Sequence, residues 1–528
     1  MECAIPNMSK VQGYTVNSSV QEDVRHTISN EEVQAYASYI NGTFGNDKDL
    51  AHHLPIQTTG GDLFKKVGDG WIFCKLINRA VEGTIDERAM KKKNLNAISK
   101  LDNLTLVCRS AQGVGISLVN NGPTDMAAGT PHLVLAFLFK LIKKVLLAPI
   151  NLNMCRGLQN LLQDEESLAD LQRISPEDLL IRWVNYQMSQ AGCHRKISNF
   201  SADITDSEVY SILLHQIAPP QFGVNLEALR LTEKTDRASK MLEEAAKINV
   251  DNFVTAAQVV GGHSWLNLAF VANVFNKFPG FPEVENKGQV EQIQLETREE
   301  KMYRHFLNSL GVSPQITHLY DGIKNGLVLL QALEVVSPGS VDWKKAIQKI
   351  PNRQKTFSSL INLNISIEAG RNLGFRLIGI DGKNLFDEDQ TAVFSLLWQL
   401  MREYTIVTVR KAGQGKIVSD TKILSWANES LRSAGYSVEL RSFKDKTLSD
   451  GKVILELLNW IKPGTVDMQL FEEGQSFETK MKNCRLAITL SRKIGAVIYA
   501  LPEDIVECNS KMMLTVFAVL MSVAVQMA

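Results

Sequence analysis

Two glycine-containing stretches of the 528-residue chain carry part of a phosphate-binding motif. Gly415-Lys416 would suit the end of a Walker loop, in which backbone N–H groups and a lysine hold phosphate, but Arg410 stands where the first glycine is required. Gly113-Val114-Gly115 begins like a dinucleotide fingerprint, but Leu118 occupies the third glycine position. Both stretches are therefore interpreted as turns between helices.

Residues that could hold a metal or act as a nucleophile do not fall at the required spacings. The nine histidines form neither HExxH nor a zinc pattern, the seven cysteines form no CxxC, and no GxSxG occurs. The stretch 381–387 begins like a calcium loop, but its glycine comes too early and Leu385 occupies a ligand position. We expect no catalytic residues, no cofactor and no metal. An active site built from distant residues remains the rival hypothesis, and it predicts a pocket with converging polar groups.

Lysines instead form two local clusters that suit an acidic partner surface. Lys91, Lys92 and Lys93 are consecutive, and Lys140, Lys143 and Lys144 recur at the i, i+3, i+4 spacing of one helix face. The whole chain is nevertheless neutral, with 57 basic and 57 acidic residues, so we expect no nucleic-acid partner. No run reaches the roughly 18 apolar residues of a membrane span, so no membrane insertion is expected.

The elements that carry these residues recur four times along the chain. Each copy begins with a capping residue followed by acids, continues with a polar start, a buried helix and a Gly/Pro turn, and ends with an apolar helix. The predicted last helices are 131–145, 264–278, 391–404 and 512–525. The sequence predicts an all-α protein of four modules arranged as two compact pairs: a flexible segment 1–27, then 28–148, 175–280, 297–406 and 416–527.

The scattered, unpaired cysteines and the polar N-terminus, which has no apolar segment of a signal peptide, indicate a cytoplasmic protein. A neutral array of four diverged modules favours binding over catalysis, and the chain is expected not to be an enzyme.

The ordered motifs resemble calponin-homology domains, and the four together resemble the fimbrin/plastin family of actin-bundling proteins. The resemblance runs across about 28–525 and rests on the stretches 83–89, 131–135, 268–273, 397–402, 442–447 and 499–504. It implies two actin-binding pairs in one monomer, located on cytoskeletal actin bundles and crosslinking F-actin. Family members generally carry N-terminal EF-hands, which we expect this chain to lack, so that direct calcium control would be absent.

By similarity, actin contacts come from the first and last helices of each leading module and from the start of the next module. In the first pair this selects 31–41, 131–146 and the neighbourhood of 175–186, with the candidates His132, Lys140, Lys143 and Lys144. The loop that begins at Thr84 is a further candidate and adds Arg88, Lys91, Lys92 and Lys93. In the second pair it selects Trp343, Lys344, Lys345, Gln399 and Arg402. Ordinary alternatives are a solvated face for Lys91–Lys93 and local packing for Trp343. A second functional hypothesis is that one pair binds the side of a filament and the other docks a different cytoskeletal partner.

Overall fold

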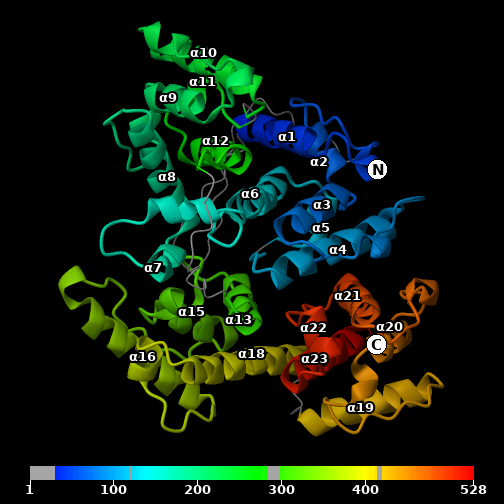
Figure 1. Cartoon of the computed structure of the whole chain (residues 1–528). Coiled ribbons are helices and arrows are strands. Elements are labelled where there is room, and N and C mark those ends of the chain that lie inside the picture. Colours follow the sequence, from blue (N-terminus) through cyan, green and yellow to red (C-terminus); the bar gives the residue numbers. More distant parts are fainter. Residues whose placement is uncertain (1–29, 119–120, 251–252, 283–295, 413–418, 528) are drawn as a thin grey trace. The chain divides into compact units, whose positions relative to one another are not determined.

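The computed structural model describes residues 30–118, 121–250, 253–282, 296–412 and 419–527. Every regular element in these ranges is helical, and none of them contains a strand, so the predicted all-α fold is confirmed (Figure 1). The predicted N-terminal segment 1–27 lies outside the described residues.

The chain forms two compact units. The described part of the first unit comprises residues 30–68 and 129–282, and that of the second comprises 69–118, 121–128, 296–412 and 419–527. The division does not fall between the second and third predicted modules. Residues 69–128 of the first module instead group with the third and fourth modules.

Nine α-helices build the described part of the first unit. They are α1 (Asn30–Phe44), α2 (Asp62–Lys66), α6 (Pro131–Leu147), α7 (Leu168–Arg173), α8 (Pro176–Gln190), α9 (Glu208–Ile217), α10 (Lys234–Lys247), α11 (Ala256–Val260) and α12 (Ser264–Lys277).

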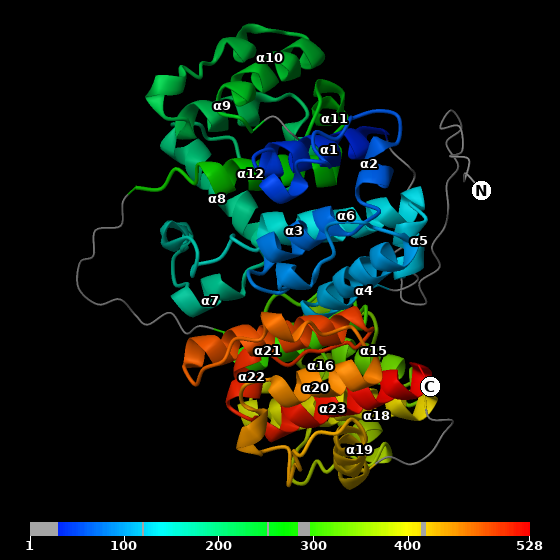
Figure 2. The same cartoon turned by 90° about the vertical axis from the view of Figure 1, so that its right-hand side faces the viewer.

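The second unit contains the remaining α-helices of the described ranges, and Figure 2 shows several of them from the side. They are α3 (Trp71–Ala80), α4 (Ala97–Gly113), α5 (Pro123–Ala127), α13 (Arg298–Ser309), α14 (Leu319–Ile323), α15 (Leu327–Val336), α16 (Lys355–Asn372), α17 (Gly382–Phe386), α18 (Gln390–Ala412), α19 (Asp420–Ser433), α20 (Lys452–Ile461), α21 (Phe477–Lys493), α22 (Pro502–Val506) and α23 (Ser510–Met527).

Capping side chains set the starts of the first helices of the modules. The Ser175 side chain accepts a hydrogen bond from the backbone N–H of Asp178, and Pro176 occupies the first turn of α8. Thr297 and Glu300 form a reciprocal capping box at the start of α13. Each cap satisfies donors that a helix leaves free at its N-terminus, which is why these polar residues begin helices.

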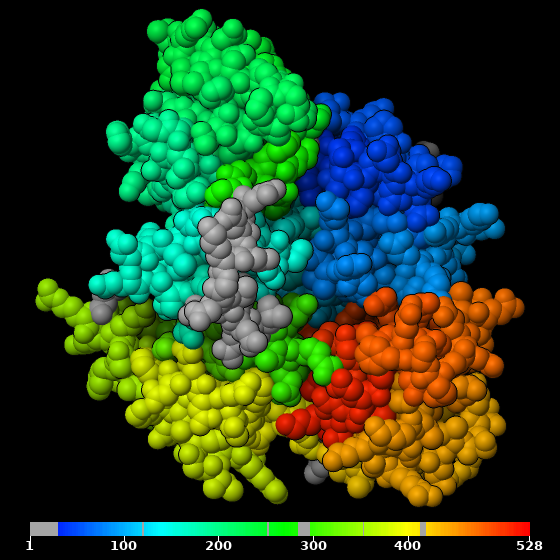
Figure 3. Space-filling view, in the orientation of Figure 1, coloured from blue at the N-terminus to red at the C-terminus, as the bar shows by residue number. Residues whose placement is uncertain are grey.

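The apolar helices α6, α12, α18 and α23 lie where the pattern predicts the last helix of each module. In the first unit α6 packs on α1 and α12. In the second unit α18 packs along α23, and the third module (green to yellow) and fourth module (orange to red) adjoin on the surface in Figure 3. α18 continues to Ala412, beyond the predicted module end at 406.

The sequence analysis found no run with the roughly 18 apolar residues of a membrane span, but one helix of the structure meets that length. Ser510–Met527 is the one helix of the described ranges that is long and apolar enough to cross a membrane, judged by length and composition alone. Of that helix, 56% is buried inside the protein, and Phe517 and Leu520 are completely buried. It therefore serves as a core helix of the second unit.

Candidate functional site

A buried asparagine positions the loop that carries Lys91, Lys92 and Lys93. The Asn103 side chain accepts a hydrogen bond from the Lys91 N–H (3.0 Å) and donates to the carbonyls of Lys91 (3.0 Å) and Asp69 (3.1 Å). The Trp71 indole donates to the Lys91 carbonyl (2.9 Å), and the Lys92 ammonium lies 4.8 Å from the centre of that ring. The loop backbone is thus held while all three lysine side chains are exposed.

An asparagine side chain holds the corresponding loop in the third and fourth modules as well. The Asn362 side chain accepts a hydrogen bond from the Ile347 N–H and donates one to the Ile347 carbonyl. Asn483 makes the same two bonds with the backbone of Glu472. In the second module Arg237 occupies this position and donates to the carbonyls of Leu231 (2.8 Å) and Asp206 (3.1 Å). Each of the four residues lies ten residues before the last residue of its helix, a spacing that the sequence contains but that the sequence analysis did not use.

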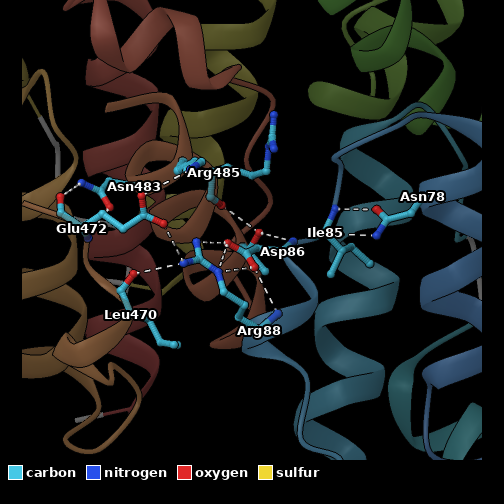
Figure 4. Close-up of polar contacts among 10 residues, drawn as sticks. Asn78, Ile85, Asp86, Arg88, Leu470, Glu472, Asn483 and Arg485 are labelled. Carbon is cyan, nitrogen blue, oxygen red and sulfur yellow. Dashed lines mark hydrogen bonds and ion pairs between the residues drawn. The ribbon is translucent and has the colours of Figure 1, made fainter. Parts of the chain in front are cut away.

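Arg88 does not stand free on this loop. Its guanidinium forms a 2.6 Å ion pair with Asp86, donates to the Leu470 carbonyl (3.2 Å) and lies 3.7 Å from the Glu472 carboxylate. Figure 4 shows Arg88 directed at the 470–472 segment of the fourth module. As a result, this predicted actin contact is engaged within the second unit, although its side chain remains 36% exposed.

Helix α21 holds the rest of that loop with side chains spaced to share one face. Thr489 Oγ1 accepts from the Asp86 N–H (3.1 Å), and the Arg492 guanidinium donates to the Thr84 carbonyl (3.1 Å). Lys493 donates to the Ala89 carbonyl. Arg492 is only 5% exposed. Burial lowers the pKa of Arg492 to about 10 and that of Lys493 to about 8.

Within the first unit, the predicted contacts on α6 lie beside α8. Lys143 forms a 3.1 Å ion pair with Glu177 in the first turn of α8. Lys140 is half-buried, and burial lowers its pKa. His132 and Lys144 are half-buried as well. The helix places the three lysines on one side, next to the start of the second module that the resemblance also selects.

The second predicted set divides into exposed and engaged residues. Lys344 and Lys345 are exposed, although Lys345 also lies 3.5 Å from the Asp342 carboxylate, and Trp343 is half-buried. The Gln399 amide bonds both backbone groups of Arg376, by accepting its N–H (2.6 Å) and donating to its carbonyl (3.2 Å). Arg402 forms a 2.6 Å ion pair with Asp420 at the start of α19. Gln399 thus holds the loop at Arg376 in its own module. Arg402 pairs with an acid at the start of the next module's first helix, as Lys143 does with Glu177.

The two pairs carry different side chains where the last helix of the leading domain meets the last helix of the following domain. Trp265 and Lys511 are the second residues of α12 and α23, and Phe139 and Trp398 lie eight residues after the first residues of α6 and α18. The Phe139 and Trp265 rings meet edge-on at 4.7 Å, whereas the Lys511 ammonium lies 5.6 Å from the Trp398 ring.

A groove of about 370 Å³ lies at the position where Lys511 replaces the tryptophan. It is lined by Glu299, Gln390, Thr391, Phe394, Ser395, Trp398 and Lys511.

A second cavity, of about 430 Å³, lies at the end of α4. It is lined mainly by polar side chains, including Arg109, Gln112 and Asp125, together with buried Cys108. Burial raises the pKa of Cys108 to about 12, so its thiol stays protonated and unreactive near neutral pH. Across the described ranges, no group of three or more His, Cys, Asp or Glu side chains is placed to hold a metal ion.

Comparison with known proteins accounts for the repeated helices. The calponin homology (CH) domain model matches residues 31–146, 174–280, 297–406 and 418–526. Plastin-3 of Homo sapiens is 42% identical over 511 residues, covering 95% of this chain and 81% of its own length. Fimbrin of Dictyostelium discoideum is 42% identical over 519 residues, covering 98% and 84%.

Among solved structures, the actin-crosslinking core of Schizosaccharomyces pombe fimbrin matches with a TM-score of 0.79 and 34% identity, covering 94% of this chain and all of that core. The chain therefore belongs to the fimbrin and plastin family of proteins with four calponin homology domains.

Proposed function

We propose that the protein crosslinks actin filaments through two tandem pairs of calponin homology domains, with boundaries at 28–148, 175–280, 297–406 and 416–527. The observation that carries this proposal is the match over 94% of the chain to a fimbrin core described as actin-crosslinking. A fragment with one pair could decorate a filament but could not join two. The matched length includes all four domains, as crosslinking by a monomer requires.

The charge of the described surface supports an acidic partner such as F-actin. The exposed Lys91–Lys93 loop is fixed by Asn103 and Trp71, so its charges are presented without much loss of backbone freedom on binding. Exposed Lys344 and Lys345 provide the corresponding charge in the third domain. Such charges accelerate encounter with an acidic filament, while apolar contacts slow its release.

Two binding sites in one chain explain how a monomer could bundle filaments. Once one pair is bound, the second pair meets a neighbouring filament at a raised effective concentration. This role requires no catalytic step. It assigns the protein to the cytoplasm and to actin bundles, and it involves neither nucleic acid nor insertion into a membrane.

A second candidate function is supported by the contacts of Arg88. Because this side chain is engaged by residues 470–472, the first pair presents only part of its predicted surface in this structure. Side-binding to actin through one pair, with a different cytoskeletal partner on the other, agrees with that geometry.

Sedimentation with actin filaments at two speeds separates these functions. A crosslinker brings actin into the low-speed pellet, because bundles sediment at forces that leave single filaments in solution. A single-pair side-binder cosediments only at high speed. A chain that stays in the supernatant at both speeds does not bind actin, and the proposal would be abandoned.

A further inference from the structure

The groove between α13, α18 and α23 lies at a place where the two pairs carry different side chains. In the first unit, the Trp265 indole packs on the Phe139 ring and donates to the Tyr36 hydroxyl at 3.1 Å. In the second unit, Lys511 stands at the equivalent place and lies over the face of Trp398. A lysine stem fills less space than an indole, which leaves the groove of about 370 Å³ open beside Phe394.

The chemistry of the groove defines what it can hold. Phe394 and Trp398, both half-buried, line it and provide an aromatic wall. Its volume lies within the range of ligand-binding clefts and is large enough for a bulky side chain. Within the described ranges, nothing accepts a hydrogen bond from the Trp398 indole N–H. Lys511 adds a positive charge at the same wall, and Glu299 of α13 contributes a negative charge elsewhere in the lining, so an acidic group is favoured only next to Lys511. Together these features fit an apolar side chain with a carboxylate next to it.

We propose that this groove receives a large apolar side chain of the actin filament, with an adjacent acidic residue of the filament paired to Lys511. The inference rests on the proposed function and specifies the contact made by the second pair. Two observations favour the filament as the occupant. The groove opens between the first and last helices of the leading domain, and its cation complements an acidic filament surface. Trp265 shows that the equivalent place in the first pair accommodates an aromatic side chain.

The difference between Trp265 and Lys511 suggests a substitution that tests the groove. Lys511→Trp converts the second pair to the arrangement of the first, fills the groove from within and removes the charge. Lys234→Trp, at an exposed lysine that begins α10, is the matched control for adding a surface tryptophan. The complete chain of each variant is sedimented with actin filaments at low and high speed, and its helicity and melting are followed by circular dichroism.

We expect Lys511→Trp to weaken the second contact by about tenfold or more, since a filled central pocket removes a binding hot spot. The variant would lose low-speed bundling and keep high-speed binding through the first pair, whereas Lys234→Trp would match the wild type. Equal bundling by Lys511→Trp and wild type would overturn the groove assignment and leave crosslinking intact. If the wild type binds no filaments, the proposed function itself fails.

A second variant tests the groove in case Lys511→Trp does not fold. Ser395 also lines the groove, on α18, and is half-buried, so Ser395→Leu fills the space while leaving Lys511 in place. If Lys511→Trp proves unfolded by circular dichroism, Ser395→Leu decides the question. Loss of bundling by this folded variant supports the groove, and unchanged bundling refutes it.

Discussion

The contact between α4 and α21 predicts that Gly113→Ala destabilises the protein, although the same change in most helices has the opposite effect. An alanine inside a helix is more favourable than glycine by about 1 kcal/mol. At Gly113, however, an added Cβ would lie 2.5 Å from Arg492 Nη2 and 3.0 Å from the Ile498 carbonyl oxygen. Separations below 3.0 Å are not tolerated, so Arg492 or α4 has to move.

The cost follows from how firmly Arg492 is held. Its guanidinium is buried and donates to the carbonyls of Thr84 (3.1 Å) and Ile498 (2.7 Å), so it is not a flexible chain end that swings aside. Overpacking costs about 1–3 kcal/mol. Weakening one charge-assisted hydrogen bond costs about 1.5 kcal/mol or more. These costs exceed the helix gain, and we expect the free energy of unfolding to fall by about 2 kcal/mol.

Urea denaturation of the full chain, followed by circular dichroism, measures this change in the transition of the second unit. Arg492→Met removes the head group that the Cβ would strike, so adding Gly113→Ala to Arg492→Met should cost less than about 1 kcal/mol. The double-mutant cycle therefore isolates the clash. An unfolding free energy of Gly113→Ala equal to or above that of the wild type would refute this reasoning.

Three other variants test separate parts of the structure. Asn103→Ala should lower the unfolding free energy by about 3 kcal/mol in urea, because the Lys91 N–H and the Asp69 carbonyl lose the bond to Asn103 and the Lys91 carbonyl keeps only that from the Trp71 indole; a loss below about 1 kcal/mol contradicts the proposed role of Asn103. Arg88→Ala should lower it by about 1 kcal/mol, since Arg88 is 36% exposed and Glu472 43%, whereas its closest partner Asp86 is only 9% exposed; a loss above about 2 kcal/mol would contradict that ranking. Burial, with nearby Glu31, raises the pKa of Glu32 to about 7, so stability should decline as pH rises from about 4.5 to about 7, by up to about 3 kcal/mol. Glu32→Gln should abolish that decline, and an unchanged pH profile in the variant would exclude Glu32 as its source.

Much of the fold could be predicted because its determinants are local. Capping residues such as Ser175 and Thr297 start helices through bonds to residues three positions later. Apolar stretches of helical length predicted the four last helices, which appear as α6, α12, α18 and α23. The end of α18 could not be predicted, because its last turns still carry the buried side chains Ile406 and Val409 beyond the expected stop.

The candidate site was less predictable because its partners are distant in the chain. Arg88 and Leu470 are separated by 382 residues, and no local pattern pairs them. The family resemblance likewise selected Gln399 as an actin contact, whereas its amide is occupied by the backbone of Arg376. The difference between Trp265 and Lys511 could have been noticed by aligning the last helices of the even-numbered domains. Its consequence, a groove, emerges only from packing.

The central claim is that one chain holds two filaments, and paired low-speed and high-speed sedimentation of the purified protein with actin filaments tests it most directly. We predict that actin enters the low-speed pellet as the protein concentration rises, with bundles visible by electron microscopy. Cosedimentation at high speed alone would contradict crosslinking and leave a side-binding protein, and the absence of cosedimentation at both speeds would contradict actin binding altogether.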